Sequence, residues 1–121
     1  MLASLIVVAT SCYYDNEEYL YPTDNTILPC DTVAVSYSLH IAPLIASKCM
    51  SCHSVAAAPS AGGNVVLEGY ANTQKAAASG KLLGAVTQAS GYAAMPKNAN
   101  KLSYCQITYI RRWVEGNSLN N

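Results

Sequence analysis

The pentapeptide CMSCH, residues 49–53, constrains the fold of this chain more than any other feature of the sequence. It places two thiols three positions apart, with an imidazole directly after the second. Three chemistries use closely spaced cysteines in this way: disulfide exchange, zinc binding and covalent haem attachment. Each requires a different structural setting, so the surrounding sequence has to discriminate between them.

The residues before this motif predict a helix that carries it. Ser38 is a candidate N-cap, and Pro43 is acceptable only near the first turn because it lacks an N–H group. We therefore expect a helix over residues 38–53 with the two thiols at its C-terminal end. Its apolar stripe, at helical spacing, consists of Tyr37, Ile41, Leu44 and Ile45.

The rest of the chain predicts further helices and no convincing pair of strands. Asn72 or Thr73 is expected to cap a helix that Gly80 closes, and residues 81–88 add one or two helical turns. A capping box from Ser103 to Gln106 begins the last helix, which ends at Gly116 with Trp113 beside its apolar face of Ile107, Ile110 and Val114. The chain is therefore expected to be all-α, with long loops around Gly62–Gly63 and Met95–Pro96.

Only one of the three cysteine chemistries fits this setting well. A thioredoxin-like motif opens a helix after a strand, whereas this one closes a helix. A structural zinc site needs four ligands, but the other cysteines are single, and His40 is the only further histidine. Haem attachment accounts for the whole motif, because Cys49 and Cys52 can add to the two vinyl groups and His53 can bind the iron.

With these features the chain resembles the class I c-type cytochromes, over about residues 37–116. The resemblance rests on a helix ending in CMSCH, a glycine-rich loop, AAMPKN and the terminal ITYIRRWVEG. It implies a small cytochrome c-like fold of three to five helices around one covalently bound haem c, with crossed N- and C-terminal helices. In that family a Met–Pro loop supplies the second axial ligand, which here is Met95, followed by Pro96.

Other residues have roles to be weighed beside these ligands. Tyr70 and Tyr92 are candidate hydrogen-bond donors to a haem propionate, although tyrosine also packs as core. His40 lies on the same helix as His53, so it should not reach the far face of the haem; it is expected to be capped and to face solvent. Met50, between the thiols, is expected to pack at the surface or at the haem edge.

The N-terminus suggests export. Residues 1–11, MLASLIVVATS, are too short to span a bilayer and resemble the signal peptide of a bacterial lipoprotein, after which Cys12 would carry the lipid. The alternative is a buried N-terminal strand with an incidental cysteine. Residues 12–35 are expected to form an extended arm, and residues 36–121 the cytochrome c domain.

Two cysteines remain beside those assigned to haem and lipid. The crossed terminal helices that the resemblance implies would allow Cys30 and Cys105 to meet. A disulfide is stable in the oxidising compartment that an exported protein enters, and would contribute about 4 kcal/mol by constraining the unfolded chain. The alternative is two unpaired thiols.

The charge distribution bears on partners. The formal net charge of the chain is zero, which gives no argument for nucleic-acid binding. From residue 32 onward, however, there are seven basic residues and only two acidic ones, Glu68 and Glu115. We therefore expect redox partner proteins with an acidic docking surface. An iron with both axial positions filled favours one-electron transfer over catalysis.

The resulting expectation is a monomeric electron carrier in a bacterial cell envelope. It would be a periplasm-facing or outer-membrane lipoprotein, held to the membrane by its lipid. Two alternatives stay open. One is a small haem enzyme, either peroxidase-like or the haem subunit of a dehydrogenase, and the other is a non-redox envelope-binding lipoprotein.

Overall fold

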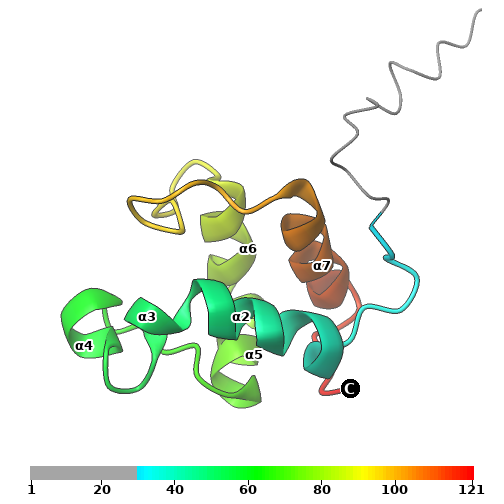
Figure 1. Cartoon of the computed structure of the whole chain (residues 1–121), viewed down its shortest axis with the longest axis horizontal. Helices are drawn as coiled ribbons and strands as arrows, with labels where there is room; N and C mark the ends of the chain where they lie inside the picture. The colour runs from blue at the N-terminus through cyan, green and yellow to red at the C-terminus, as the bar shows by residue number, and fades with distance from the viewer. Residues whose placement is uncertain (1–29) are drawn as a thin grey trace, which may run out of the picture.

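A computed structural model describes residues 30–121, and this part of the chain is helical with no strands (Figure 1). The all-α prediction is therefore confirmed for the described residues. In chain order the elements are η1 (Tyr37–Ile41), α2 (Ala42–Lys48), α3 (Met50–His53), α4 (Ala58–Ala61), α5 (Tyr70–Ala78), α6 (Lys81–Thr87) and α7 (Tyr104–Glu115).

The stretch that carries the CMSCH motif is helical as predicted, but it is not one regular helix. Its N-cap is Ser36, whose hydroxyl accepts from the Leu39 amide, and not Ser38. The first turn is a π-helix, in which the Ala42 amide donates to the Tyr37 carbonyl. Pro43 follows directly and has no N–H to offer a regular α-helical turn. The π-helical turn thus lies directly before the position that lacks this donor.

The helix α5 begins earlier than predicted. Gly69, and neither Asn72 nor Thr73, stands at its N-cap. Thr73 lies inside the helix and is fully buried, where its hydroxyl donates to the Leu67 carbonyl oxygen over 2.7 Å. The predicted closure at Gly80 is confirmed, because this residue adopts φ 73° between α5 and α6.

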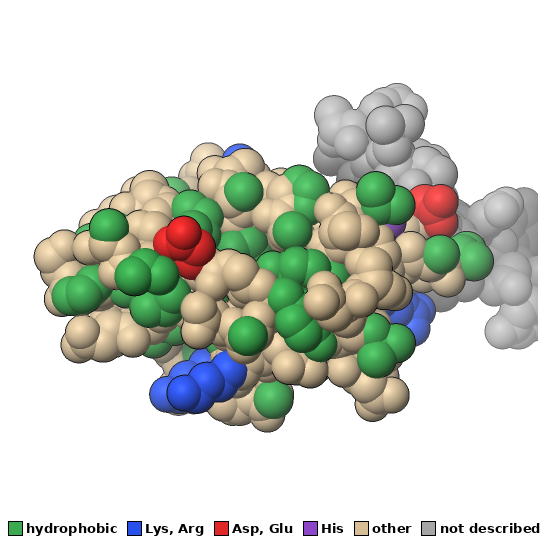
Figure 2. Space-filling view, turned by 90° about the horizontal axis from the view of Figure 1, so that it is seen from below, with side chains coloured by type: hydrophobic (Ala, Val, Ile, Leu, Met, Phe, Trp, Pro, Cys, Tyr) green, Lys and Arg blue, Asp and Glu red, His purple; other side chains and the backbone are tan. Residues whose placement is uncertain are grey.

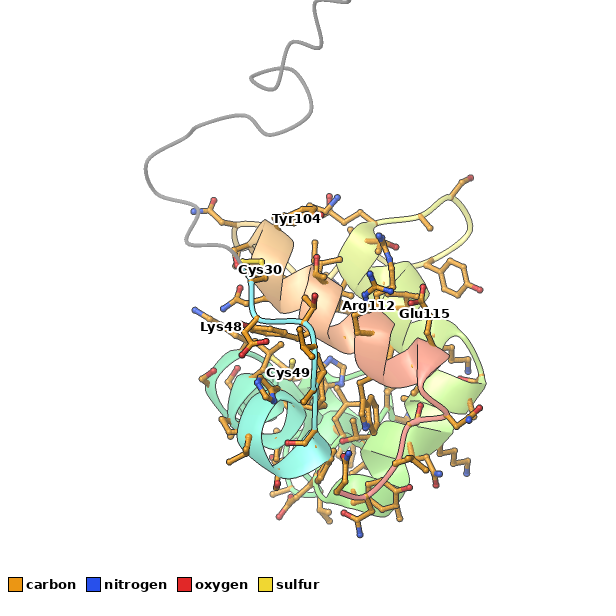
Figure 3. All side chains as sticks on the ribbon, turned by 90° about the vertical axis from the view of Figure 1, so that its right-hand side faces the viewer. Cys30, Lys48, Cys49, Tyr104, Arg112 and Glu115 are labelled. Carbon is orange, nitrogen blue, oxygen red and sulfur yellow. A yellow bond between two sulfur atoms is a disulfide. The ribbon has the colours of Figure 1, made fainter. Side chains whose placement is uncertain are left out.

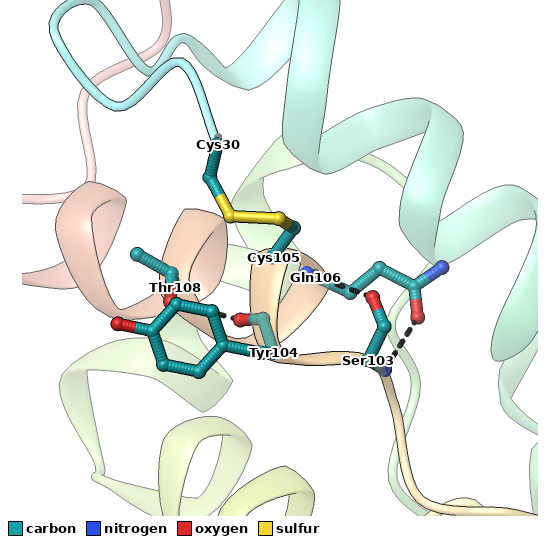
Figure 4. The surroundings of a disulfide bond; sticks show 6 residues. All are labelled: Cys30, Ser103, Tyr104, Cys105, Gln106 and Thr108. Carbon is teal, nitrogen blue, oxygen red and sulfur yellow. Dashed lines mark hydrogen bonds between the residues drawn. A yellow bond between two sulfur atoms is a disulfide. The ribbon is translucent and has the colours of Figure 1, made fainter. Parts of the chain in front are cut away.

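The last helix matches its prediction closely. The Ser103–Gln106 capping box is present, with both reciprocal hydrogen bonds formed, and α7 ends at Gly116 (Figure 4). The residues after α7 fold back on the domain. There the Trp113 indole donates to the Leu119 carbonyl over 2.8 Å.

One apolar core joins the N-terminal helical stretch to α6 and α7. Ile41 and Ile110 are fully buried in it, and Trp113 is 2% exposed. Figure 1 shows α7 descending onto the η1 end of the η1–α2 stretch, and these two elements are in contact. The two helices predicted to cross thus share a core, and their contact is concentrated on η1. The buried members of the core are Ile41, Leu44, Ile45, Leu67, Ala76, Ala77, Leu82, Val86, Leu102, Ile110 and Trp113.

A disulfide joins Cys30 to Cys105, with a Cα–Cα distance of 5.4 Å, as Figures 3 and 4 show. The two cysteines predicted to pair thus lie at disulfide distance in the structure. The bond ties the chain before η1 to the first turn of α7, across a sequence separation of 75 residues.

The predicted signal peptide (residues 1–11), the lipidated Cys12 and most of the arm lie outside the described residues. Within residues 30–121, none of the helices has the length and apolar character needed to cross a membrane.

Candidate functional site

An apolar cavity of about 280 Å³ lies among α2, α3, α6 and the loop before α7. Val65, Leu67, Leu82, Val86 and Leu102 supply much of its aliphatic wall. Residues predicted for the haem site contribute to the same wall: Cys49, His53, Tyr92, Met95 and Pro96. The topology therefore brings most of the predicted site together, although its members are far apart in sequence.

A second hollow of about 680 Å³ borders the first. His53, Met95 and Pro96 line both spaces, so they stand at the boundary between them. The outer space is lined by Gly62 and Gly63 on one side and by residues 93–99 on the other. His53 and Met95, which belong to different segments, thus face common space.

The His53 side chain is 8% exposed and held in one orientation. Its Nδ1 lies 2.7 Å from the Val65 carbonyl oxygen. A carbonyl can only accept, so Nδ1 carries the proton, and in the neutral imidazole Nε2 keeps its lone pair. The Leu67 amide also donates to the His53 carbonyl over 2.8 Å, which fixes the backbone beside the ring. In this tautomer the hydrogen bond orients the ring and leaves Nε2 as the nitrogen that can bind a metal.

Gly62 permits this arrangement. A side chain at this position would collide with the Cys52 carbonyl oxygen and would stand 3.0 Å from His53 Nδ1. The loop after α4 can therefore approach α3 only where no Cβ is present. Sequence reasoning identified Gly62 as a chain break and missed this contact.

The two thiols of the motif have different surroundings. Cys49 lies between α2 and α3, is half-buried in the cavity wall, and burial raises the pKa of its thiol to about 11. Cys52 is exposed and does not line the cavity. Neither thiol is in a disulfide. The structure therefore places Cys49, His53 and Met95 in the site and leaves the Cys52 thiol at its outside.

The Met95–Pro96 segment is anchored to α6. The Met95 amide donates to the Ala85 carbonyl oxygen over 3.1 Å, and its side chain is half-buried. The loop setting predicted for Met95 is thus present. This residue lines the cavity, and its thioether is a soft group of the kind that binds metal ions.

The two tyrosines proposed as propionate donors lie in different places. Tyr92 lines the cavity and is 44% exposed. Tyr70 does not line it: its hydroxyl donates to the Ser118 carbonyl over 2.9 Å, and its ring packs edge-on against Tyr37. Tyr70 therefore fastens the C-terminal residues to α5 and has its one proton already engaged.

His40 is also placed away from the cavity, as expected from its helix position. Its Nδ1 accepts from the Ser36 amide over 3.2 Å, and its ring lies 5.0 Å from that of Tyr109. It is half-buried, so the expectation of a solvent-facing histidine was wrong.

The rival chemistries gain no support from the geometry. Among residues 30–121 there is no cluster of three or more His, Cys, Asp and Glu side chains that would hold a metal ion. The CMSCH motif closes the helical stretch and does not follow a strand.

No family model, curated protein or solved structure matches the chain.

Proposed function

We propose that this chain is a single-haem c-type electron-transfer protein, related to the class I c-type cytochromes. One observation carries the proposal: His53 and Met95, from α3 and from the loop before α7, border the same apolar cavity. Histidine and methionine together are the axial pair typical of electron-transfer cytochromes.

The residues present fit a haem group. Its ring requires apolar walls, which the cavity supplies, and the adjoining hollow of about 680 Å³ falls in the range of roughly 300–1,000 Å³ common for ligand pockets. Its iron requires a neutral imidazole nitrogen, which the Val65 hydrogen bond makes available as His53 Nε2. Cys49 in the wall and Cys52 at the outside are the proposed attachment residues.

The chain's own residues have distinct tasks in this proposal. His53 and Met95 would both bind the haem iron, which would leave no open position for a substrate. The aliphatic wall, including Leu82 and Leu102, would keep water from the iron. Haem bound in this way supplies a one-electron couple. Because both residues would hold the iron, we propose electron transfer and no catalytic reaction.

The cellular setting is part of the same proposal. Lipidation at Cys12 would tether the protein to the bacterial cell envelope, as a periplasm-facing or outer-membrane lipoprotein. The domain would act as a monomer and meet acidic redox partners. The charge balance supports this last point, since residues 30–121 carry seven basic side chains and only three acidic ones, Asp31, Glu68 and Glu115. Charged side chains are few on the face in Figure 2, and the basic ones lie near its outline.

The deciding experiment exports the full chain together with a haem-attachment system. A haem stain that survives boiling in denaturant should be lost in Cys49→Ala/Cys52→Ala. The oxidised protein should show the weak far-red band of methionine–iron ligation, and Met95→Ala should abolish it. Met50→Ala is the matched control, because Met50 packs against the core but does not line the cavity.

The other outcomes separate the alternatives. A spectrum of five-coordinate iron in the parent protein would favour a small haem enzyme. Absence of covalent haem in the exported parent would contradict the proposal and favour a non-redox envelope-binding lipoprotein.

A further inference from the structure

The cavity wall is apolar apart from a few polar groups, and its only charged side chains are Lys48 and Lys81. No Asp or Glu among residues 30–121 lines this cavity or the adjoining hollow, where Lys97 is the one charged residue. Neither Lys48 nor Lys81 forms an ion pair with a described residue. A cavity with an apolar interior and positively charged side chains at its rim is suited to an apolar ligand that carries anionic groups at its edge.

Tyr92 adds a hydroxyl near the start of α6, the helix that Lys81 begins. Its ring lies flat against α6 at Gly84, where a Cβ would stand 2.6–2.7 Å from three of its ring carbons. The ring points toward the start of the helix, because the Tyr92 hydroxyl oxygen would lie only 3.4 Å from a Cβ on Gly80. Lys81 is the next residue. Because Gly84 has no side chain, the Tyr92 ring can lie along α6 with its hydroxyl at the N-terminal end of that helix, where Lys81 also lies.

The two lysines stand on different sides of the cavity. Lys48 directly precedes Cys49, and Figure 3 shows both on the side formed by α2, with α6 across the molecule from them. Lys81 is the first residue of α6. In a haem, the two vinyl groups occupy one edge of the ring and the two carboxylates the opposite edge. A ring attached through Cys49 would therefore turn its carboxylates away from Lys48.

We propose that Lys81 and Tyr92 form the carboxylate-binding corner of the cavity, with Lys81 providing the charge and Tyr92 a hydrogen-bond donor. This inference rests on the proposed function and deepens it, because it assigns the polar end of the bound ligand to α6 and the following loop. It also gives the two cavity lysines different roles, although both line the same space.

The test measures the reduction potential of the exported, haem-loaded protein between pH 5 and 9. The potential falls with pH wherever a carboxylate next to the iron titrates. Lys81→Gln removes a neighbouring positive charge, which raises the pKa of that carboxylate. The pH-dependent region should therefore move upward, on the order of one pH unit. Tyr92→Phe should move it in the same direction, and Lys81→Arg should restore the parent profile.

Lys48→Gln is the matched control, since it removes the same charge from the rim of the same cavity. The inference predicts that its pH profile stays within a few tenths of a unit of the parent. An equal shift in Lys48→Gln and Lys81→Gln would overturn the inference, and so would an unchanged profile in Lys81→Gln. In both of these results the haem stain persists, so the proposed function survives. A parent protein without covalent haem would overturn both proposals.

Discussion

The His53 imidazole donates its Nδ1–H to the carbonyl oxygen of Val65, twelve residues further along the chain, over 2.7 Å. This bond fixes which ring nitrogen is free, and it holds the ring at the boundary of the two cavities. The intervening loop must pass tightly around α3 for the carbonyl to reach the ring. The geometry of the proposed iron ligand therefore depends on a loop that contributes no side-chain chemistry of its own.

Gly62→Ala tests this dependence. The new methyl group would collide with the Cys52 carbonyl oxygen and press on His53 Nδ1, so the loop or α3 must move. We expect a loss of about 1–3 kcal/mol in the free energy of unfolding, together with a changed haem spectrum in the loaded protein. Chemical denaturation and absorption spectroscopy check both effects.

Gly63→Asn is the control for that variant. A Cβ at Gly63 meets no atom within 4 Å, and asparagine tolerates its φ of 59°. This control should retain the parent spectrum and lose little stability. If Gly62→Ala behaved like Gly63→Asn, the close approach would not govern the site.

The motif residues could be predicted from sequence because their chemistry depends on local spacing. CMSCH places both cysteines and His53 within one helical stretch, and Met95 is marked by the proline and the loop around it. Val65 contributes through its backbone carbonyl, a group that every residue carries, so no residue type marks it. Gly62 was noticed as a break in the chain, but its contact partner is set by the tertiary fold.

The same distinction applies to the helices. The last helix was predictable because its capping box, between Ser103 and Gln106, is a local pattern. The divided N-terminal stretch was not, although Pro43 was seen to be compatible only with a first turn. Its π-helical turn lets the chain accommodate this proline and keep Ile41 in the core, a compromise that spacing alone does not reveal.

The two thiols of the motif should react at very different rates in the haem-free protein. Cys52 is exposed, whereas burial raises the pKa of Cys49 to about 11, so at pH 8 only roughly one Cys49 thiol in a thousand is ionised. Iodoacetamide should modify Cys52 first. Modification of Cys49, followed in Cys52→Ser by mass spectrometry, should accelerate about tenfold per pH unit as the pH approaches 11. Equal rates at the two cysteines would contradict their assigned environments.

The raised pKa of Cys49 also predicts how stability depends on pH. The folded haem-free chain keeps this proton up to about pH 11, whereas the unfolded chain releases it near 9.0. The buried thiol therefore contributes fully below pH 9, and its contribution is lost as the pH rises toward 11. Urea denaturation at pH 8 and pH 10.5 should show a smaller decline in Cys49→Ala than in the parent.

Tyr70→Phe separates structural from ligand-binding tyrosines. The variant removes the donor to the Ser118 carbonyl, so we expect a loss of about 1 kcal/mol in unfolding free energy. Because Tyr70 does not line the cavity, the pH profile of the reduction potential should match the parent. Tyr92→Phe provides the comparison, with a displaced profile. A displaced profile in Tyr70→Phe would instead return this residue to the proposed site.

Reduction of the Cys30–Cys105 disulfide should weaken the fold without releasing haem. The bond spans 75 residues, a loop for which chain entropy gives about 4 kcal/mol of stabilisation. Cys30→Ser should melt at lower temperature than the parent and keep the boiling-resistant haem stain, because thioether bonds resist thiol reductants. Peptide mapping without reductant checks the pairing directly. If Cys30→Ser melted like the parent, the disulfide would not contribute to stability.

Ile110→Ala tests the packing that joins α7 to the N-terminal helical stretch. Ile110 is fully buried in the same core as Ile41, and η1 packs against α7. Truncation would leave a cavity that neighbouring side chains only partly fill, at a cost of about 2–5 kcal/mol.

Leu39→Ala is the control, because Leu39 lies in η1 but is 76% exposed, and its loss should change stability by no more than about 0.5 kcal/mol. Thermal and chemical denaturation of the two variants decide the point. Since η1 leads directly into the segment that presents Cys49 and His53, we expect Ile110→Ala also to broaden the haem spectrum. An Ile110→Ala variant as stable as Leu39→Ala would show that this contact does not hold the terminal helices together.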